Sequence, residues 1–302
     1  MTSSTLTQIG PVGQPPAPVE PAPRRRGRRN GSRLGLAVRI ALAVVASAVV
    51  FFPLYWMLVI AFSPRGEVFR PGGVQFWPSQ LSTENFATVF ARFPVADWFV
   101  NSVVIGAFVT VLTVTVNLLA GYAFARIRFA GRGILFILAL ATMMIPVQAI
   151  MVAQFRLVTG LQLAGTYWSV ILPGAAAAFG LFLARQFFLS IPQELIEAAR
   201  MDGAGHLRTF AQIVLPLSKP LIAVLTLLTL LGSWNDFAWP LIALKDPALF
   251  TLPIGLLYLK GQSTPDYSAS MALALISVIP MVVLFLLFQR YFVQGFARSG
   301  IR

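Results

Sequence analysis

The chain has 302 residues, of which 57% are hydrophobic and only 11% are charged. Soluble globular domains carry about 25% charged residues, so this composition excludes an ordinary soluble protein and indicates a membrane protein. The formal net charge is +13, and cysteine is absent. No nucleic-acid partner is predicted, because the arginines cluster in the N-terminal tail and in short loops, as they do in membrane proteins. The absence of cysteine excludes a disulfide framework and a cysteine-ligated metal site.

The N-terminal residues 1–33 are rich in Pro, Ser, Gly and Arg and lack apolar periodicity, which predicts a disordered cytoplasmic tail. Five arginines within residues 24–29 directly precede the first apolar segment. We interpret them as a topology signal, with contact to anionic membrane lipid as the alternative. A cleaved signal peptide is a competing interpretation, but the apolar stretch continues to Phe62 and is too long for one.

Six apolar segments are long enough to cross a bilayer as helices. They are residues 36–62, 99–124, 134–153, 167–188, 220–241 and 268–290. Because no strand-like alternation supports a barrel, we predict an all-α polytopic membrane protein with six transmembrane helices. The predicted parts are a tail (1–33), a first helix with an external loop (34–98), a core of five helices (99–295) and a C-terminal tail (296–302).

The distribution of the 23 basic residues orients these helices. Most of them fall in the N-terminal tail and in the loops on the same side, so the positive-inside rule places both termini in the cytoplasm. The polar loop of residues 190–220 lies on that side too. We expect a multi-pass protein of the cell membrane. Either of its two longer external segments, residues 63–98 and 246–267, could receive an extracytoplasmic partner, with plain connecting loops as the alternative.

Residues 190–220 form the densest charged segment outside the tail. Ser190 followed by Gln193 has the spacing of a capping box, and we predict a short amphipathic helix over residues 193–201. One face of this helix is expected to hold Leu195, Ala198 and Ala199.

Glycine and proline are expected to end the two helices of this loop. Gly203 is expected to end the first helix, because glycine adopts the left-handed backbone conformation without strain. A second short helix is predicted over residues 206–214. It is expected to end at Leu215, because the residue before a proline, here Pro216, is disfavoured in the α-helical region. The loop is therefore predicted to form a helix, a turn and a second helix at a membrane surface.

The spacing of residues within the loop points to a family. Glu197-Ala198-Ala199, then Gly203, then Ile213-x-Leu215-Pro216 resembles the EAA loop of ABC-importer permeases. The resemblance implies that the loop contains a coupling helix that docks into a cleft on a cytoplasmic ATPase subunit. The residues to which it implies an ATPase-coupling role are Glu197, Ala198, Ala199, Asp202, Gly203, Ile213, Leu215 and Pro216. The alternative is an ordinary cytoplasmic hairpin.

Further stretches resemble the carbohydrate-uptake branch of these permeases, the maltose-type second permease. They include Asn101-Ser102, Ala120 to Arg126, Ala141 to Pro146, Trp234 to Phe237 and Gln289 to Gly295. The resemblance implies an importer made of this chain, a second permease subunit, a dimer of ATP-binding subunits and an extracytoplasmic solute-binding protein. It implies a sugar as the substrate, with glycerol phosphate or another polyol as the alternative.

The sequence shows no motif for catalysis. A phosphate-binding Walker A loop needs Gly-Lys-Ser/Thr, and the three lysines, Lys219, Lys245 and Lys260, are not preceded by glycine. We therefore expect a protein that is not an enzyme, with ATP hydrolysed in a separate partner subunit. The single histidine, His206, cannot build a histidine metal site. No catalytic residue, metal or cofactor is predicted.

Asp236 is the acidic residue within a predicted span, and an ionisable group there indicates function. Asn235 beside it and the rings of the flanking Trp234 and Trp239 suit a sugar, which has apolar faces and hydroxyl groups. We predict a translocation path lined by Trp234, Asn235, Asp236, Asn117 and Gln148. A structural cap explains Asp236 equally well. Hydrogen bonds between helices would explain Asn117 and Gln148.

The residues give less support to two other classes of protein. An ion-driven secondary transporter would need buried carboxylates or inverted repeats, and Asp236 alone is available in a predicted span. A membrane enzyme or assembly scaffold would need a nucleophile or a metal cluster, which the sequence does not show.

Overall fold

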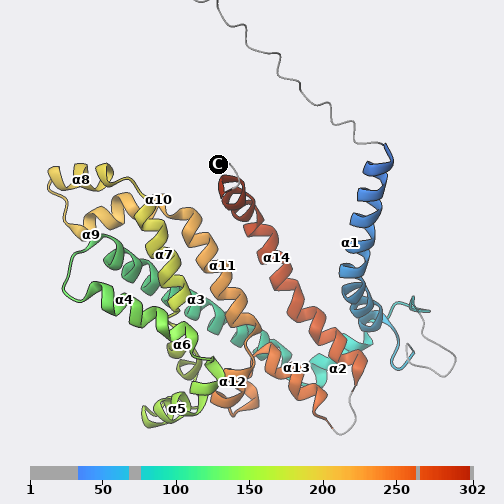
Figure 1. Cartoon of the computed structure of the whole chain (residues 1–302). Coiled ribbons are helices and arrows are strands. Elements are labelled where there is room, and N and C mark those ends of the chain that lie inside the picture. The colour runs from blue at the N-terminus through green and yellow to red at the C-terminus, as the bar shows by residue number, and fades with distance from the viewer. Residues whose placement is uncertain (1–32, 68–75, 263–265, 300–302) are drawn as a thin grey trace, which may run out of the picture. The chain divides into compact units, whose positions relative to one another are not determined.

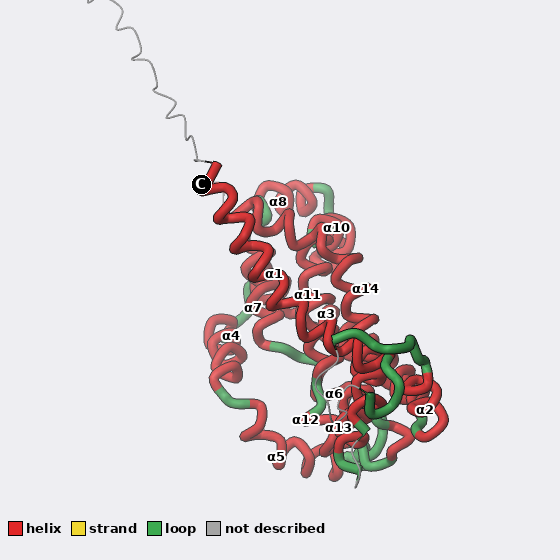
Figure 2. The backbone as a smooth tube through the Cα atoms, turned by 90° about the vertical axis from the view of Figure 1, so that its right-hand side faces the viewer, coloured by secondary structure: helices red, strands yellow, loops and turns green. Residues whose placement is uncertain are grey.

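The computed structural model describes residues 33–67, 76–262 and 266–299. Every regular element within these ranges is helical (Figure 1, Figure 2), in agreement with the predicted all-α class. The predicted disordered tail lies outside the described residues except for Arg33, where the first helix begins. The chain forms two compact units, Met1–Phe51 and Phe52–Arg302.

The first unit contains one described element, the N-terminal part of α1 (Arg33–Phe62). This helix is long and apolar enough to cross a bilayer from Gly35 to Phe62. The span predicted over residues 36–62 is therefore a continuous helix.

The second unit begins with the end of α1 and contains all the other described helices. Two of these are long, α3 (Val95–Arg126) and α14 (Tyr267–Ser299). The shorter elements are α2 (Glu84–Arg92), α4 (Arg132–Ala141), η1 (Thr142–Met144), α5 (Val147–Gly160), α6 (Trp168–Gly174), α7 (Ala178–Ser190), α8 (Gln193–Met201), α9 (His206–Thr209), η2 (Phe210–Val214), α10 (Leu215–Leu217), α11 (Lys219–Asn235), α12 (Ala238–Ala243), η3 (Pro247–Leu249) and α13 (Leu252–Lys260).

Like the first predicted span, the second and the last are continuous helices. The span predicted over residues 99–124 lies within α3, and the one over 268–290 lies within α14. α14 continues to Ser299, past the predicted end of its span and into the segment predicted as a C-terminal tail. Both helices have the length and hydropathy of a membrane span.

The other three predicted spans are not continuous helices. The segment predicted over residues 134–153 is broken where η1 meets α5, at 106°, and the one over 167–188 is bent by 40° between α6 and α7. α11 ends before the end predicted at residue 241, and it meets the helices of the preceding loop at 78°. Proline explains the sharpest break, because Ile145 before Pro146 takes an extended conformation with φ of −89° and ψ of 119°.

α3 is the central helix of the second unit and packs against α6, α7, α11 and α13. Its close approach to α7 depends on Gly121, since a Cβ added there would lie 2.6 Å from the Ala184 Cβ. Small facing residues allow membrane helices to approach closely. α8 and α9 lie at one end of α3, α7 and α11, whereas α2, α12 and α13 lie at the opposite end (Figure 1).

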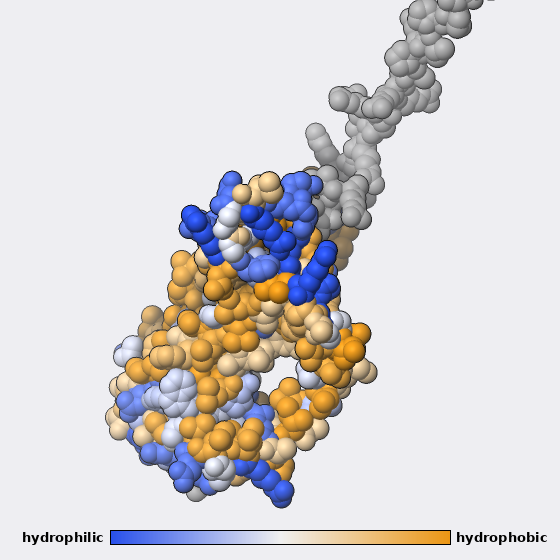
Figure 3. Space-filling view, turned by 90° about the vertical axis from the view of Figure 1, so that its left-hand side faces the viewer, coloured by the Kyte–Doolittle hydropathy of each residue, from blue (hydrophilic) through white to orange (hydrophobic). Residues whose placement is uncertain are grey.

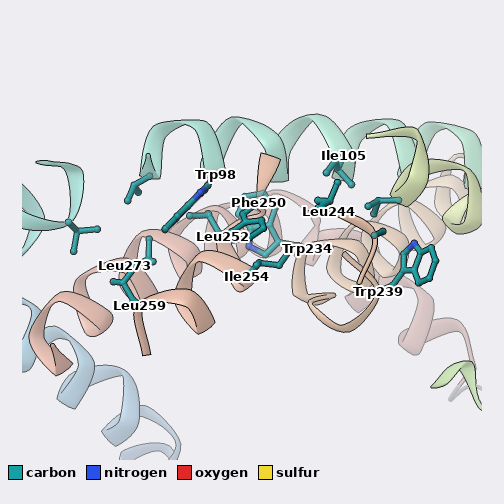
Figure 4. Close-up of a cluster of buried hydrophobic side chains, with 14 of the residues drawn as sticks. Trp98, Ile105, Trp234, Trp239, Leu244, Phe250, Leu252, Ile254, Leu259 and Leu273 are labelled. Atoms are coloured by element: carbon teal, nitrogen blue, oxygen red, sulfur yellow. The ribbon is translucent and has the colours of Figure 1, made fainter. Parts of the chain in front are cut away.

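A buried apolar cluster joins the N-terminal half of α3 to α12, α13 and α14 (Figure 4). Hydrogen bonds from the Asn101-Ser102 motif hold the chain around η3 against it. Asn101 Nδ2 donates to the carbonyl oxygens of Ala248 and Phe250 at 2.8 and 2.9 Å. Ser102 Oγ accepts from the Leu252 N–H at 2.8 Å. The motif therefore has a structural role at this end of the bundle.

Candidate functional site

The polar loop of residues 190–220 folds into α8, a tight turn and the helical run α9–η2–α10 (Figure 1). α8 covers the residues predicted for it, Gln193–Met201. The predicted capping box is wrong, because Ser190 ends α7 and its hydroxyl donates to the Phe187 carbonyl oxygen at 2.7 Å. Pro192 precedes the first residue of α8 instead, with no side-chain cap. Its φ of −54° is the value that its ring imposes.

α8 buries a different face from the one predicted. Ile196 and Ala199 are 1% and 6% exposed, and Ile196 belongs to a buried cluster with Phe188 of α7. Leu195 is 44% exposed, and Ala198 is exposed too. Residues three apart share a helical face, so Ile196 and Ala199 form the inner stripe and Leu195 and Ala198 form an outer one. The predicted grouping of Leu195 and Ala198 with Ala199 is therefore wrong.

The turn after α8 is made at Gly203, whose φ of 76° confirms the predicted left-handed conformation. The Gly203 N–H donates to the Arg200 carbonyl oxygen at 3.0 Å, and the Ala204 N–H donates to that of Ala199 at 2.9 Å. A Cβ added to Gly203 would meet no atom within 4 Å. A side chain there is therefore opposed by backbone strain and not by crowding. The preceding Asp202 is exposed.

The second helix of the loop runs further than predicted. The backbone is helical through Leu215 and Pro216, so the predicted end at Leu215 is wrong. Leu215 has α-helical φ and ψ of −62° and −44° despite the proline that follows. The π-helical η2, which contains the half-buried Ile213, lies directly upstream. Such wider turns accommodate local irregularity in a helix. The break comes at Ser218, whose ψ is 7°.

Arg126, at the C-terminal end of α3, fixes the junction between α7 and α8. Its Nη2 donates to the carbonyl oxygens of Phe188, at 2.6 Å, and of Ile191. Its Nη1 donates to Gln193 Oε1 at 2.5 Å, and Gln193 Nε2 donates to Glu197 Oε1 at 3.2 Å. A chain of hydrogen bonds thus joins α8 to the end of α3. In the sequence, Arg126 is a basic residue beside a span and the last residue of a stretch that resembles the carbohydrate-uptake permeases, but nothing there indicates these hydrogen bonds.

A polar cavity of about 770 Å³ lies beside this junction, between α8 and the connection from α3 to α4. Its titratable lining residues are Arg126, Arg128, Arg132, Glu197, Arg200 and His206. Positive charge exceeds negative charge among them. The surface next to α8 therefore complements an acidic partner surface.

A second cavity, of about 760 Å³, lies between α3, α5, α7 and α11. Figure 3 shows this face of the molecule hollowed, with both apolar and more polar residues around the opening. Asn117, Gln148, Asn235 and Asp236 line it, so the fold brings together predicted path residues from three separate stretches of the sequence. Other uncharged polar residues of the wall, among them Gln154, had no distinguishing signal in the sequence.

The structure places Trp234 elsewhere. Its side chain is 4% exposed and lies in the buried cluster (Figure 4), and its Nε1 donates to the Ser277 carbonyl oxygen at 3.1 Å. Trp239 belongs to the same cluster and is 5% exposed, but it also lines the cavity, and its Nε1 donates to the Ser169 carbonyl oxygen at 3.0 Å. The chain is extended at Asp236 between α11 and α12, so helical periodicity does not continue from one tryptophan to the other.

Asn117 is buried in the cavity wall, 2% exposed, opposite Gly180 of α7. A Cβ added to Gly180 would lie 2.1 Å from Asn117 Nδ2, so the glycine makes room for the amide. This Nδ2 has no hydrogen-bond partner in the part of the chain that the structure describes. A buried donor without a partner costs about 1–3 kcal/mol. The nitrogen itself is buried from solvent between α3 and α7, so it does not face the open cavity.

Asp236 combines the two roles considered for it. Its Oδ1 accepts from the Trp239 N–H at 3.4 Å, as a cap at the start of α12 would. The side chain is also half-buried and lines the cavity. Because this hydrogen bond is long, the carboxylate keeps capacity to accept from a ligand. The neighbouring Asn235 donates its Nδ2 to the Leu231 carbonyl oxygen at 2.9 Å.

Comparison with known proteins gives consistent matches over most of the chain. A family model described as "Binding-protein-dependent transport system inner membrane component" matches residues 117–298. The arabinooligosaccharides transport system permease protein AraQ of Halalkalibacterium halodurans is 38% identical, with 91% of this chain and 99% of that protein covered. The sn-glycerol-3-phosphate transport system permease protein UgpE of Escherichia coli O1:K1 is 33% identical, with 85% and 94% covered.

Solved structures show the same fold. A chain in the crystal structure of a bacterial ABC transporter involved in the import of the acidic polysaccharide alginate superposes with a TM-score of 0.78 at 23% identity. The match covers 87% of this chain and 98% of that one. A chain of the bacterial alginate transporter in complex with an alginate pentasaccharide-bound periplasmic protein superposes with a TM-score of 0.63 at 16% identity, covering 85% and 93%.

Proposed function

Because the chain belongs to the family of binding-protein-dependent transport system inner membrane components, we propose that it is a permease subunit of an ABC importer for a sugar. A permease of this family is a transport protein and not an enzyme. The substrate is a mono- or oligosaccharide, in line with a relative named for arabinooligosaccharides. The chain crosses the cell membrane six times, through α1, α3, α14 and the three bent helix pairs, with both termini in the cytoplasm.

The observation that carries this proposal is the outward surface of α8 and α9. Leu195 and Met201 of α8 are 44% and 88% exposed, and Leu207 of α9 is 79% exposed. These side chains lie in the polar loop and not in the apolar spans, so a protein partner and not membrane lipid would cover them. Docking of α8 into a cleft of a cytoplasmic ATP-binding subunit would cover them. The basic cavity beside α8 adds a charge complement for the same partner.

Movement of the docked α8 reaches the substrate cavity through α3 and α7. Ile196 fixes α8 to the buried cluster with Phe188 of α7, and Arg126 ties the α7–α8 junction to the end of α3. α3 and α7 are also walls of the cavity that contains Asn117. Closure of the ATPase dimer therefore moves these walls as a rigid body against the second permease. The path then alternates between inward- and outward-facing states.

The remaining partners use other surfaces. The extracytoplasmic solute-binding protein docks at the end of the bundle opposite α8, where α2 and α13 lie. The second permease completes the wall of the hollowed face (Figure 3). Outward apolar side chains, such as Ile134 and Ile137 of α4, which are 68% and 67% exposed, contact membrane lipid or that second subunit.

Reconstitution tests the proposal. The chain, a second permease and the ATP-binding subunits are placed in proteoliposomes with the binding protein outside. A panel of labelled mono- and oligosaccharides, with sn-glycerol 3-phosphate and other polyols, is then offered. Uptake should require ATP on the ATPase side and should not respond to a proton or sodium gradient. Gradient-driven uptake without ATP, or purification without a nucleotide-binding subunit, would instead support a secondary transporter.

The panel also separates the main alternative substrate. A relative named for sn-glycerol-3-phosphate is 33% identical, so a phosphate ester or another polyol is the second candidate. Preferential ATP-driven uptake of sn-glycerol 3-phosphate would keep the ABC-permease function and replace the sugar.

A further inference from the structure

The wall of the substrate cavity lacks the charge that an anionic ligand needs. Among the described residues that line it, Asp236 is a carboxylate and none is an arginine, lysine or histidine. The other polar side chains of the wall are neutral amides and hydroxyls. They include Thr113, Asn117, Gln148, Gln154, Thr229 and Ser233.

Cations on the surrounding helices are engaged away from this wall. Lys245, after α12, lies over the ring of Phe155 with its Nζ 5.6 Å from the ring centroid. Arg185 of α7 lies over the ring of Phe136, with Cζ 4.3 Å from the centroid. Arg156 of α5 is exposed and is not a lining residue. The carboxylate of Asp236 therefore sets the sign of the charge that a ligand meets on this wall.

We infer that this cavity selects uncharged saccharides over anionic ones, and that Asp236 is the residue that determines this preference. The inference rests on the proposed function and deepens it. Family membership alone does not decide the charge, because one relative is named for arabinooligosaccharides and another for sn-glycerol-3-phosphate. A phosphate ester or a uronate would face a like charge with no compensating cation, and such repulsion is strong where water is scarce.

A neutral saccharide is not repelled by the Asp236 carboxylate and can form hydrogen bonds with the wall. Its hydroxyl groups donate to the Asp236 carboxylate and exchange hydrogen bonds with the amides of Gln148 and Gln154 on the same wall. The ring of Phe179, which lines the same wall and is 49% exposed, suits the apolar face of a sugar ring. Removal of the carboxylate therefore weakens the discrimination against anions.

A matched pair of probes tests the inference: digalacturonate, which is anionic, and its methyl ester, which has nearly the same shape and no charge. Binding to the detergent-solubilised permease–ATPase complex is measured by saturation-transfer NMR without the binding protein, whose own selectivity is thus excluded. For the native complex the ester should bind at least about ten-fold better than the acid. In Asp236→Asn this ratio should fall several-fold, whereas Asp236→Glu should keep it.

Asp97→Asn is the matched control, because it removes an exposed carboxylate from the first turn of α3 outside the cavity. The ratio should not change in this variant. Equal binding of the two probes by the native complex, binding of neither, or an unchanged ratio in Asp236→Asn would overturn the inference. If Asp236→Asn does not assemble, the ratio of ester to acid binding in the native complex and in Asp236→Glu still tests the inference. Failure of the proposed function would appear separately, as saccharide uptake that does not need ATP.

Discussion

Gly203 is a residue at which backbone conformation, and not packing, determines what is tolerated. Its φ is 76°, and an added Cβ would meet no atom within 4 Å. Valine there should cost about 1–2 kcal/mol of local strain and displace α9 from α8. We expect Gly203→Val to lower sugar uptake more than ten-fold per ATP hydrolysed, while the complex still assembles in the membrane.

The neighbouring Gly205 supplies the control for this prediction. Its φ of −72° is ordinary for any residue, and its surroundings are equally open. Gly205→Val should therefore retain most of the coupling between hydrolysis and uptake. Equal behaviour of the two variants would show that the left-handed turn is not what the loop requires.

Arg126 satisfies the carbonyl oxygens of Phe188 and Ile191 at the end of α7. Arg126→Gln removes the guanidinium fork and should destabilise the complex by about 1–3 kcal/mol, the range for a polar group that loses its partner. Arg128 is a suitable comparison because it lies two residues away, is exposed and lines the same basic cavity. Thermal unfolding of Arg126→Gln and Arg128→Gln should therefore differ, and equal melting temperatures would contradict a positioning role for Arg126.

At the scale of the helices, the approach of α3 to α7 depends on Gly121. Glycine-to-alanine exchange inside a helix normally stabilises it by about 0.5–1 kcal/mol. At Gly121 the sign should reverse, because the added Cβ would lie 2.6 Å from Ala184 Cβ and 3.1 Å from backbone atoms of α7. Gly133 of α4 has no atom within 4 Å of an added Cβ, so Gly133→Ala should stabilise. Melting curves of the two variants would test whether Gly121→Ala lowers the melting temperature while Gly133→Ala raises it.

The helices could be predicted from the sequence where hydrophobic runs are long, as in α1, α3 and α14, because a single helix of that length needs no partner to specify it. The breaks near Ile145 and Asp236 could not, because proline and polar residues indicate an interruption without its angle. α8 was predictable as a helix, yet its inner face was not, since Leu195 and Ile196 are equally apolar. The choice between them is made by the cluster around Phe188.

The candidate site, too, could be predicted only in part from the sequence. Asn117, Gln148 and Asp236 stand out because polar groups in apolar segments are costly, and they line the cavity. Trp239 and not Trp234 lines the cavity because the chain is extended at Asp236. The hydrogen bonds of Arg126 depend on the packing of α7 beside α3. Such tertiary relations leave no periodic trace in the sequence.

At the scale of the whole molecule, an ion pair links the segment after α1 to the residue before α14. Arg65, after α1, donates its Nη2 to Asp266 Oδ2 at 2.5 Å, just before α14 begins. Partial burial acts to raise the pKa of Asp266. Hydrogen bonds from the Ala269 N–H and the Arg65 guanidinium, with the charge of Arg65, outweigh it and leave the pKa below its usual value. The folded state therefore favours the ionised carboxylate.

The sign of the pH dependence follows from this lowered pKa. The contribution of Asp266 to stability is fully present above the pKa of the unfolded chain, about 3.9 for an aspartate. It is lost as the pH falls through the lower value of the folded state. The melting temperature of the native complex should exceed that of Asp266→Asn by a constant amount between about pH 5 and pH 8. The difference should shrink below about pH 4 and in high salt. Because both side chains are partly exposed, it should correspond to about 1 kcal/mol or less. A difference that grows on acidification would contradict the assignment of an ionised Asp266 to the folded state.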